Sequence, residues 1–243
     1  NLYVKQLFDF LDMPVKQEKD IKDKVDIGKI ESIEFKNVSF KYPNREEYAL
    51  KNISFKINKG ENVFLVGENG SGKTTLIKLL VGFYYDYEGD ILVNDTSIKA
   101  IGQENLREKI GVVFQDFNKY ELSCRENIAL GKLEYINNNA KIDEAIDKAY
   151  ANDIVSSLAN GIDTQLGVWF DEGVQLSGGQ WQKIALARVF LRDADCYILD
   201  EPSSALDPVS EYEIFKKTSK IAKNKISIFI SHRLSSTRFC DRI

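Results

Sequence analysis

The stretch NVFLVGENGSGKTTLIKLL, residues 62–80, joins an apolar run to a glycine-rich loop and then to a helical pattern. Residues 62–66 are mostly apolar without alternation, as in a strand buried on both faces of a parallel sheet. The loop from Gly67 to Thr74 fits G-x-x-x-x-G-K-[ST], and residues 73–83 predict a helix. Glycines let backbone N–H groups turn inward around phosphates, and a helix N-terminus adds partial positive charge. This order predicts a phosphate-binding loop.

Two side chains of the loop have separate tasks. Lys73 supplies a full positive charge near the β- and γ-phosphates of a nucleotide, and Thr74 offers its hydroxyl to Mg²⁺. The other residues expected to bind the nucleotide here are Gly67, Glu68, Asn69, Gly70, Ser71, Gly72 and Thr75. The alternative is a glycine-rich turn closed by a threonine cap, which needs no ligand, but the flanking strand and helix favour nucleotide binding.

A second apolar run, CYILDE at residues 196–201, ends in two acids. Asp200 at the end of a buried strand is placed to hold Mg²⁺ through water, and Glu201 is placed to accept a proton from an attacking water. In isolation such a pair is usually the start of a solvated loop. Downstream of a phosphate-binding loop we favour the catalytic interpretation.

The pattern around these motifs predicts an α/β fold. Residues 1–27 predict a short amphipathic helix and a charged linker, and the folded body, residues 28–243, opens with alternating, strand-like runs. Between about residues 117 and 179 the buried strands stop and helix-compatible segments replace them, which indicates a helical insertion. Elsewhere apolar strands, among them residues 90–94, follow helices, so we expect a mostly parallel sheet covered on both faces.

Composition excludes several classes of function. Among 243 residues, 33 Lys and Arg oppose 37 Asp and Glu, so the net charge of −4 does not favour nucleic acid as a partner. The three cysteines, Cys124, Cys196 and Cys240, form no CxxC pair, which argues against a disulfide framework or a zinc site and fits a reducing cytosol. The single histidine is His232, so imidazole chemistry has to occur there.

The pentapeptide LSGGQ, Leu176 to Gln180, stands upstream of CYILDEP. Together with the phosphate-binding loop, this order of motifs closely resembles the nucleotide-binding domains of ATP-binding cassette (ABC) proteins over about residues 30–243. The resemblance implies a P-loop NTPase (RecA-like) core with a β-rich N-terminal subdomain and an inserted α-helical subdomain. It also implies ATP hydrolysis with Mg²⁺ by two domains that pair head to tail.

The signature itself has two compatible interpretations. Ser177 and Gln180, three residues apart, form a capping box pattern that opens a helix. The same geometry exposes the N–H groups of Gly178 and Gly179 at a helix N-terminus, which is an anion site. The resemblance implies that Ser177, Gly178, Gly179 and Gln180 bind the γ-phosphate of ATP held by the other subunit.

Four further residues match the family one by one. Tyr42 resembles the aromatic residue on which adenine stacks, although a tyrosine beside Pro43 also suits a packed turn. Gln115 resembles the glutamine that reaches Mg²⁺ and water. Asp207 suits a helix N-cap before proline, and the resemblance adds communication across the dimer. His232 resembles the histidine that contacts the γ-phosphate, although a lone histidine is more often structural.

The run LGVWFDEGVQLSGGQWQKIALAR, residues 166–188, looks most like exporters of lantibiotic-type peptides. We therefore expect an ATPase at the cytoplasmic face of the cell membrane, with a second, identical ABC domain and an upstream, fused transmembrane domain as partners. The stretch TQLGVWFDEGVQ, residues 164–175, departs from the TEVGERG-like stretch that exporters commonly carry before the signature. The family usually continues beyond residue 243, so we expect a truncated C-terminus.

Other functions stay open. An exporter of lipid or drug is compatible with the same motifs. A non-transport ABC ATPase acting on DNA or ribosomes is the alternative of a different class, but Gln115 and the signature lie only about 60 residues apart, without the long coiled coil of the chromosome and repair types. A kinase-like P-loop enzyme is disfavoured by LSGGQ.

Overall fold

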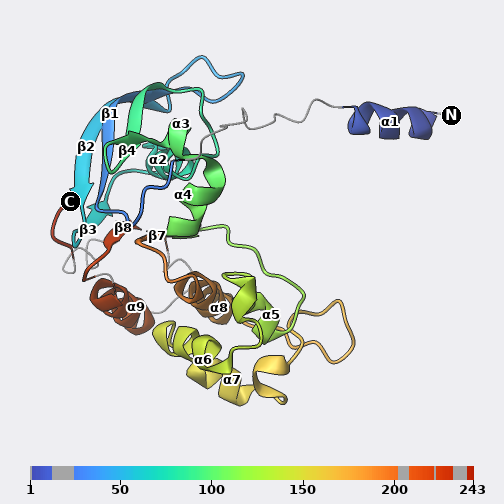
Figure 1. Cartoon of the computed structure of the whole chain (residues 1–243). Coiled ribbons are helices and arrows are strands. Elements are labelled where there is room, and N and C mark those ends of the chain that lie inside the picture. The colour runs from blue at the N-terminus through green and yellow to red at the C-terminus, as the bar shows by residue number, and fades with distance from the viewer. Residues whose placement is uncertain (1, 13–24, 202–207, 222, 232–239) are drawn as a thin grey trace.

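The computed structural model describes residues 2–12, 25–201, 208–221, 223–231 and 240–243 (Figure 1). Its strands are β1 (Ser32–Phe40), β2 (Leu50–Asn58), β3 (Asn62–Leu65), β4 (Glu88–Val93), β5 (Thr96–Ser97), β6 (Ile110–Val113), β7 (Cys196–Asp200) and β8 (Ile226–Ile230). Its helices are α1 (Leu2–Leu11), α2 (Lys73–Leu80), α3 (Ile98–Ile101), α4 (Gln103–Lys109), α5 (Cys124–Ala129), α6 (Asn139–Lys148), α7 (Asn152–Ser157), α8 (Gly178–Leu191) and α9 (Pro208–Ile221), with 3₁₀ turns η1 (Leu133–Tyr135) and η2 (Gly161–Asp163).

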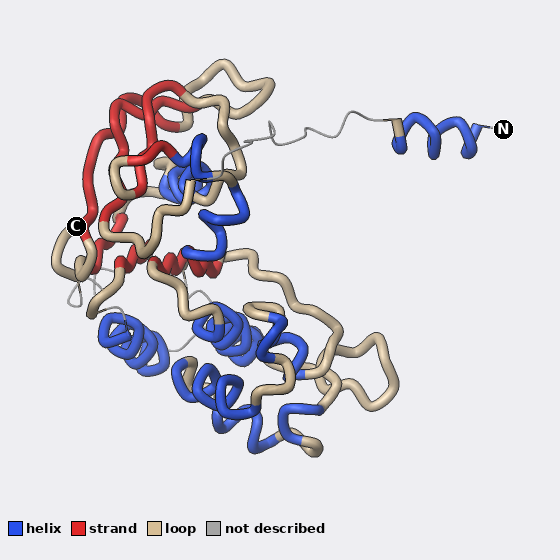
Figure 2. The backbone as a smooth tube through the Cα atoms, viewed as in Figure 1, coloured by secondary structure: helices blue, strands red, loops and turns tan. Residues whose placement is uncertain are grey.

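Two sheets organise the body. One is antiparallel, with the order β2-β1-β4-β5, and the other is parallel, with the order β3-β8-β7-β6. Figure 2 shows the strands gathered in one half of the molecule and most helices in the other. The predicted α/β class with a β-rich opening is confirmed.

The parallel sheet is covered on both faces, as its continuous apolar strands predict. In β7, Tyr197 and Leu199 join a core with α8 and the helices between β6 and α8, whereas Cys196 and Ile198 join a core with α2 and the antiparallel sheet. Successive side chains of a strand point to opposite faces, so each strand contributes to both cores. The carboxyl ends of β3 and β7 therefore lie at the same edge of the parallel sheet, between the two cores, and β8 separates them.

The strand predicted at residues 90–94 belongs to the other sheet. It is part of β4, which pairs antiparallel with β1 and, through Asn94 and Asp95, turns back into β5. Asn94 and Asp95 both have positive φ, 50° and 60°, the conformation of a two-residue hairpin turn. Such a turn can join only antiparallel strands, which explains why this strand does not continue the parallel core.

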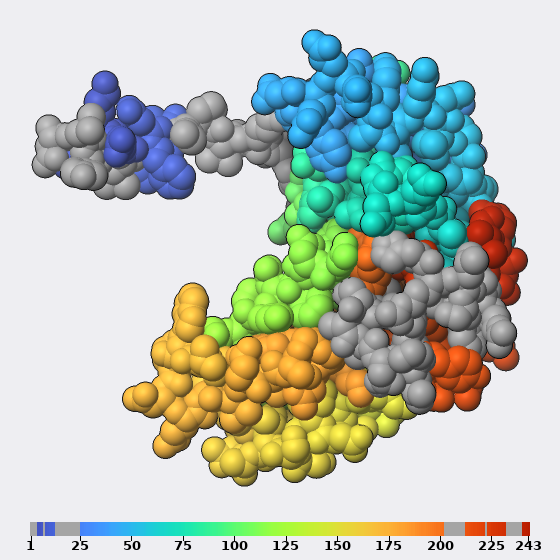
Figure 3. All heavy atoms as spheres, turned by 180° about the vertical axis from the view of Figure 1, so that it is seen from behind, coloured from blue at the N-terminus to red at the C-terminus, as the bar shows by residue number. Residues whose placement is uncertain are grey.

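Helices fill the interval between β6 and α8. Buried apolar side chains of α5, α6 and α8, such as Ile128, Ile142 and Ile184, form one core with the face of the parallel sheet that carries Tyr197 and Leu199. The Arg188 guanidinium joins α8 to α5 by donating to the backbone oxygen of Asn127 at 2.9 Å and to its side-chain oxygen at 3.2 Å. Seen from behind, the β-rich part lies above and this helical part below, with a hollow between them (Figure 3). Among the helices of the described residues, none has the length and apolarity to cross a membrane.

Candidate nucleotide site

The phosphate-binding loop connects β3 to α2 in a conformation that requires glycine. Gly70 and Gly72 have φ of 81° and 93°. A Cβ atom at Gly72 would lie 2.7 Å from the Ala49 backbone oxygen and 2.7 Å from Leu50 Cδ2, so any other residue is excluded by space as well as by φ. Gly72 is also the N-cap of α2 and makes no side-chain cap, which leaves the first N–H groups of α2 available for an anion.

Lys73 is folded onto its own loop. Its Nζ donates to the backbone oxygens of Gly67 at 2.7 Å and Glu68 at 2.9 Å, and lies 3.3 Å from Ser71 Oγ. Within the described part of the chain, no carboxylate forms an ion pair with this ammonium group. A full positive charge is thus held at the mouth of the loop by neutral dipoles, which leaves it able to pair with a phosphate.

Thr74 and Asp200 meet across the ends of α2 and β7. The Thr74 hydroxyl donates to Asp200 Oδ2 at 2.7 Å. Asp200 is only 1% exposed, and its Oδ1 has no hydrogen-bond partner among the described residues. Burial raises the pKa of this carboxyl group, while the hydrogen bond from Thr74 acts in the opposite direction.

These two residues fit a magnesium ion. A buried carboxylate oxygen without a partner beside a threonine hydroxyl is a hard oxygen donor set of the kind that Mg²⁺ prefers. In the described ranges no group of three or more His, Cys, Asp and Glu side chains is placed to hold a metal alone. Mg²⁺ is commonly bound by one or two protein groups together with substrate phosphates and water, so a site of this size suits a metal that arrives with a nucleotide.

Tyr42 is fixed over the start of α2. Its hydroxyl lies 2.9 Å from Thr75 Oγ1. Its ring stands edge-on to Phe40 and to Tyr84, with centroid distances of 5.1 and 5.4 Å. Such perpendicular aromatic contacts are favourable and restrict the ring.

One cavity of about 420 Å³ brings most of the predicted residues together, a size suited to a small-molecule ligand. Its lining consists of Tyr42, Ala49, Asn69, Gly70, Ser71, Gly72, Lys73, Thr74, Thr75, Gln115 and Glu201. Gly67 and Glu68 lie beside it as acceptors for Lys73, and Asp200 reaches it through Thr74. The sequence did not identify Ala49, because its place depends on the contact between the start of β2 and Gly72.

Glu201 and Gln115 enter the cavity from the ends of β7 and β6. Glu201 directly follows Asp200 and has a φ of 50°, and its backbone N–H donates to the Ile230 backbone oxygen at 2.9 Å. A glutamate in this left-handed region is strained, and such strain is concentrated at functional sites. Gln115 is exposed in the turn after β6. Both side chains therefore border the loop that holds Lys73.

The signature lies elsewhere. The predicted capping box is confirmed: Ser177 Oγ accepts from the Gln180 backbone N–H at 3.3 Å, and Gln180 Oε1 accepts from the Ser177 N–H at 2.8 Å. Buried Leu176 and Trp181 anchor the motif on either side, while Ser177 and Gly178 are exposed. None of the four signature residues lines the cavity of its own chain. Asp207 and His232, the two remaining predicted residues, lie outside the described residues.

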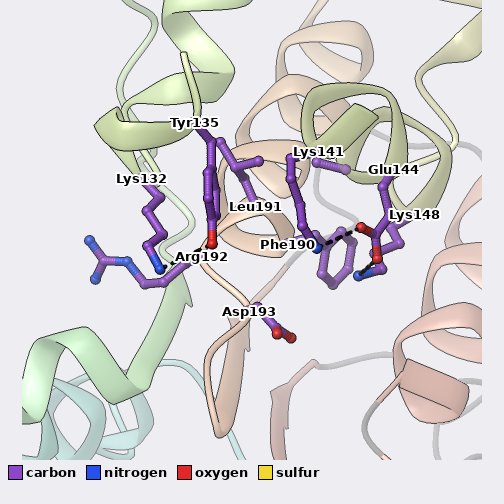
Figure 4. Close-up of a pocket in the computed structure, with 10 residues that line it drawn as sticks. Lys132, Tyr135, Lys141, Glu144, Lys148, Phe190, Leu191, Arg192 and Asp193 are labelled. Carbon is purple, nitrogen blue, oxygen red and sulfur yellow. Dashed lines mark hydrogen bonds and ion pairs between the residues drawn. The ribbon is translucent and has the colours of Figure 1, made fainter. Parts of the chain in front are cut away.

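A second, smaller cavity of about 120 Å³ lies between η1, α6 and the end of α8 (Figure 4). Each of its three lysines has a carboxylate partner. Glu144 binds Lys148 at 2.8 Å and Lys141 at 3.1 Å, and Lys132 pairs with Glu134 at 2.9 Å. We assign no ligand to it, because these lysines already have carboxylate partners.

Comparisons with known proteins show the family of this chain. The family model described as ABC transporter matches residues 50–204. The chain is similar to the subtilin transport ATP-binding protein SpaT of Bacillus subtilis, at 50% identity over the whole chain and 39% of that protein. It is similar to the nisin transport ATP-binding protein NisT of Lactococcus lactis subsp. lactis, at 45% identity over the whole chain and 41% of that protein.

A third relative, the ATP-dependent lipid A-core flippase of Escherichia coli (strain K12), is 40% identical over 98% of this chain and 40% of its own length. Among solved structures, a bacterial Atm1-family ABC exporter with ATP bound superimposes with a TM-score of 0.87 and 31% identity, over 98% of this chain and 41% of that one. The chain thus spans about 40% of the length of these relatives. It belongs to the ABC transporter family, as its ATP-hydrolysing domain.

Proposed function

We propose that this chain is the ATPase domain of an exporter and that ATP hydrolysis drives the export of a peptide across a membrane. The observation that carries the proposal is the meeting of Lys73, Thr74 and Glu201 around one cavity, with Thr74 bonded to Asp200. This set contains a phosphate-binding cation, a metal-binding pair and a base.

The side chains have distinct roles in this proposal. The N–H groups of the loop and the Lys73 ammonium hold the phosphates, and Thr74 and Asp200 would hold Mg²⁺, which neutralises charge on the phosphates when bound. Glu201 accepts a proton from a water whose oxygen forms a bond to the γ-phosphorus, while the bond from that phosphorus to the β–γ bridging oxygen breaks and ADP leaves. Gln115 orients this water, and His232 contacts the γ-phosphate.

Two copies act head to tail. The signature residues, Ser177 to Gln180, do not line the cavity of their own chain, and they start α8 with the N–H groups of Gly178 and Gly179 at its N-terminus, which supports a role at the γ-phosphate held by the other copy. ATP then binds the closed pair more tightly than the open one, and hydrolysis removes the group that holds it closed. Asp207 communicates across the pair.

A loop of the helical part supports a contact with a transmembrane domain. Val168, Trp169 and Phe170 are consecutive and are 65%, 82% and 58% exposed. Consecutive large apolar side chains on a surface favour an interface. We propose that a transmembrane domain of the same protein covers this loop, which places the chain at the cytoplasmic face of the membrane.

Peptide is the cargo that the relatives favour. The proteins named for transport of subtilin and nisin are 50% and 45% identical to this chain, compared with 40% for the lipid A-core flippase. A lipid is therefore the second candidate.

The Glu201→Gln variant tests the ATPase chemistry. We expect turnover to fall by about 10²–10⁴-fold, the usual contribution of a general base, while ATP binding persists, because the amide keeps the shape of the side chain. ATP hydrolysis and equilibrium ATP binding measure the two effects. Normal turnover in this variant would overturn the assignment of Glu201.

Membrane vesicles that carry the complete exporter test the cargo. With wild-type protein we expect ATP-dependent accumulation of a labelled lantibiotic-type peptide, and none with Glu201→Gln. Transfer of a labelled lipid without peptide accumulation would replace the first candidate with the second. ATP hydrolysis with neither transfer, together with binding to ribosomes, would overturn the exporter function.

A further inference from the structure

The segment that carries Tyr42 contacts the phosphate-binding loop at one point and the first turn of α2 at another. The Ala49 backbone oxygen lies so close to Gly72 that no Cβ fits between them, and the Tyr42 hydroxyl bonds to Thr75. The Ala49 N–H also donates to the Phe40 backbone oxygen at 2.8 Å, which closes the base of this segment. Tyr42 is thereby held against the first turn of α2 rather than left as an independent flap.

Two adjacent threonines of that turn serve different partners. Thr74 directs its hydroxyl to Asp200, and Thr75 directs its hydroxyl to Tyr42. Successive residues of a helix point about 100° apart, so the two hydroxyls diverge. Thr75 is buried, with 7% of the residue exposed, and it lines the cavity together with Tyr42.

The chemistry of the two hydroxyls suggests a direction for the bond. A threonine hydroxyl has one hydrogen to donate and two lone pairs that accept. A phenol is a better donor than an alkyl hydroxyl, so Tyr42 donates to Thr75. The hydroxyl hydrogen of Thr75 then remains available for a phosphate oxygen in the cavity that both residues line.

We infer that Thr75 is a positioning residue that links recognition of the base to recognition of the phosphates through the chain Tyr42 O–H to Thr75 O–H to phosphate. The inference rests on the proposed function, because it takes Tyr42 as the surface on which the base stacks. A hydrogen-bond chain of this kind strengthens each member, so binding of the phosphates makes Thr75 a better acceptor and fixes the tyrosine ring. Triphosphate and base would then bind cooperatively.

Four variants test the chain in steady-state ATP hydrolysis: Tyr42→Phe, Thr75→Val, Thr75→Ser and the double variant Tyr42→Phe/Thr75→Val. We expect Tyr42→Phe to raise the KM for ATP by about three- to tenfold with kcat unchanged, the usual effect of one lost hydrogen bond. Because such coupling is reciprocal, inhibition by inorganic tripolyphosphate, which has no base, should be weakened by Tyr42→Phe and more strongly by Thr75→Val. Thr75→Ser, which keeps the hydroxyl, should restore both values.

The double variant decides whether the two residues act as one unit. If they do, Tyr42→Phe has less than about a twofold further effect on KM in the Thr75→Val background, since the partner of the phenol is already gone. The control is Tyr48→Phe, which removes a phenol from the same segment, bonded to Glu88 at 3.1 Å and outside the cavity. Its KM should equal that of the wild type.

Independent, multiplying effects of Tyr42→Phe and Thr75→Val would overturn the hydrogen-bond chain. A Tyr42→Ala variant separates this failure from failure of the proposed function. If Tyr42→Ala raises KM and Tyr42→Phe does not, the base still stacks on the ring but the chain to Thr75 is wrong. If neither variant raises KM, Tyr42 does not contact the base at all.

Discussion

Two helices of this chain start with glycine-containing motifs and expose their first N–H groups, yet their N-termini are built differently. α2 begins at Lys73 without a side-chain cap, at a cavity that Lys73, Thr74 and Glu201 line and that Thr74 connects to Asp200 by a hydrogen bond. α8 begins at Gly178 with a complete capping box and lies outside that cavity. The N-terminus of α2 is fully stabilised only when a ligand binds, whereas the N-terminus of α8 is already stabilised by its capping box.

The difference separates the two halves of the proposed ATP site: the half at α2 lies in a cavity of its own chain, and the half at α8 does not. Around α2 no ion pair joins the charged groups within the described residues: Asp200 has one oxygen without a hydrogen-bond partner, and Lys73 donates only to neutral acceptors. At α8, the side chains of Ser177 and Gln180 each accept a hydrogen bond from the other residue's backbone N–H. The N–H groups of Gly178 and Gly179 have no acidic side chain in the same turn. A single positive helix end binds an anion weakly, so in the proposed head-to-tail pair this half contributes only when another copy brings a nucleotide to it.

The largest expected effect comes from Gly178→Asp. Gly178 is exposed and does not have positive φ, so an aspartate fits the backbone. An acid in the first turn stabilises a helix by about 0.3–1 kcal/mol, but here it would repel a phosphate. We expect unchanged or higher thermal stability together with an ATPase rate about 10²-fold lower, comparable to the loss of a preorganised donor.

Asn139→Asp is the matched control for that variant. Asn139 is the exposed first residue of α6, and its side-chain oxygen already accepts from Arg125 at 2.8 Å. It should gain similar stability and keep full activity. If Gly178→Asp also keeps full activity, the N-terminus of α8 is only a structural cap and the comparison with α2 fails.

Local patterns predicted the two helix starts because their determinants are adjacent in sequence. The strand, loop and helix around Gly67 to Thr74, and the spacing of Ser177 and Gln180, specify their conformations without the rest of the chain. What the sequence could not give were contacts between distant segments. The contact of Ala49 with Gly72 and the bond between Tyr42 and Thr75 depend on how β2 and its preceding loop dock on α2.

The same limit applies to the sheets. Apolar runs predicted the strands, but an apolar run does not say which strand will be its neighbour. The strand at residues 90–94 has the composition of the parallel core, and its sheet is decided by the turn at Asn94 and Asp95. Burial of Asp200 likewise follows from the assembled core, not from its neighbours in sequence.

A smaller effect is expected from Asp200→Asn, which tests the uncompensated charge at α2. The pKa of Asp200 is raised by burial, so the folded state holds this proton more tightly than the unfolded state. Its contribution to stability is therefore present at low pH and is lost as the pH rises through the folded pKa. At neutral pH the variant removes a buried charge, and its amide oxygen still accepts from Thr74.

We therefore expect Asp200→Asn to melt higher than the wild type at pH 7, by roughly 2–4 °C for each kcal/mol released, with the gain disappearing toward pH 3. The added stabilisation by Mg²⁺ with ATP should be lost. Thermal unfolding with and without Mg²⁺ and ATP, across this pH range, measures both. A lower melting temperature at pH 7 would show that the carboxylate is compensated, contrary to the orphaned Oδ1.

The smallest effect compares two capping boxes of the same chain. Ser123 and Glu126 form one at α5, and Ser177 and Gln180 form the other at α8. Replacing either serine with alanine removes one side-chain acceptor, so each variant should lose about 0.5–2 kcal/mol of the free energy of unfolding. Only Ser177→Ala should also lower the ATPase rate, because only the hydroxyl at α8 would meet the phosphate of another copy. If both variants lose equal stability and keep the wild-type ATPase rate, Ser177 acts only as a helix cap, as Ser123 does. The N–H groups of Gly178 and Gly179 would then be the only groups of the signature that act on the phosphate.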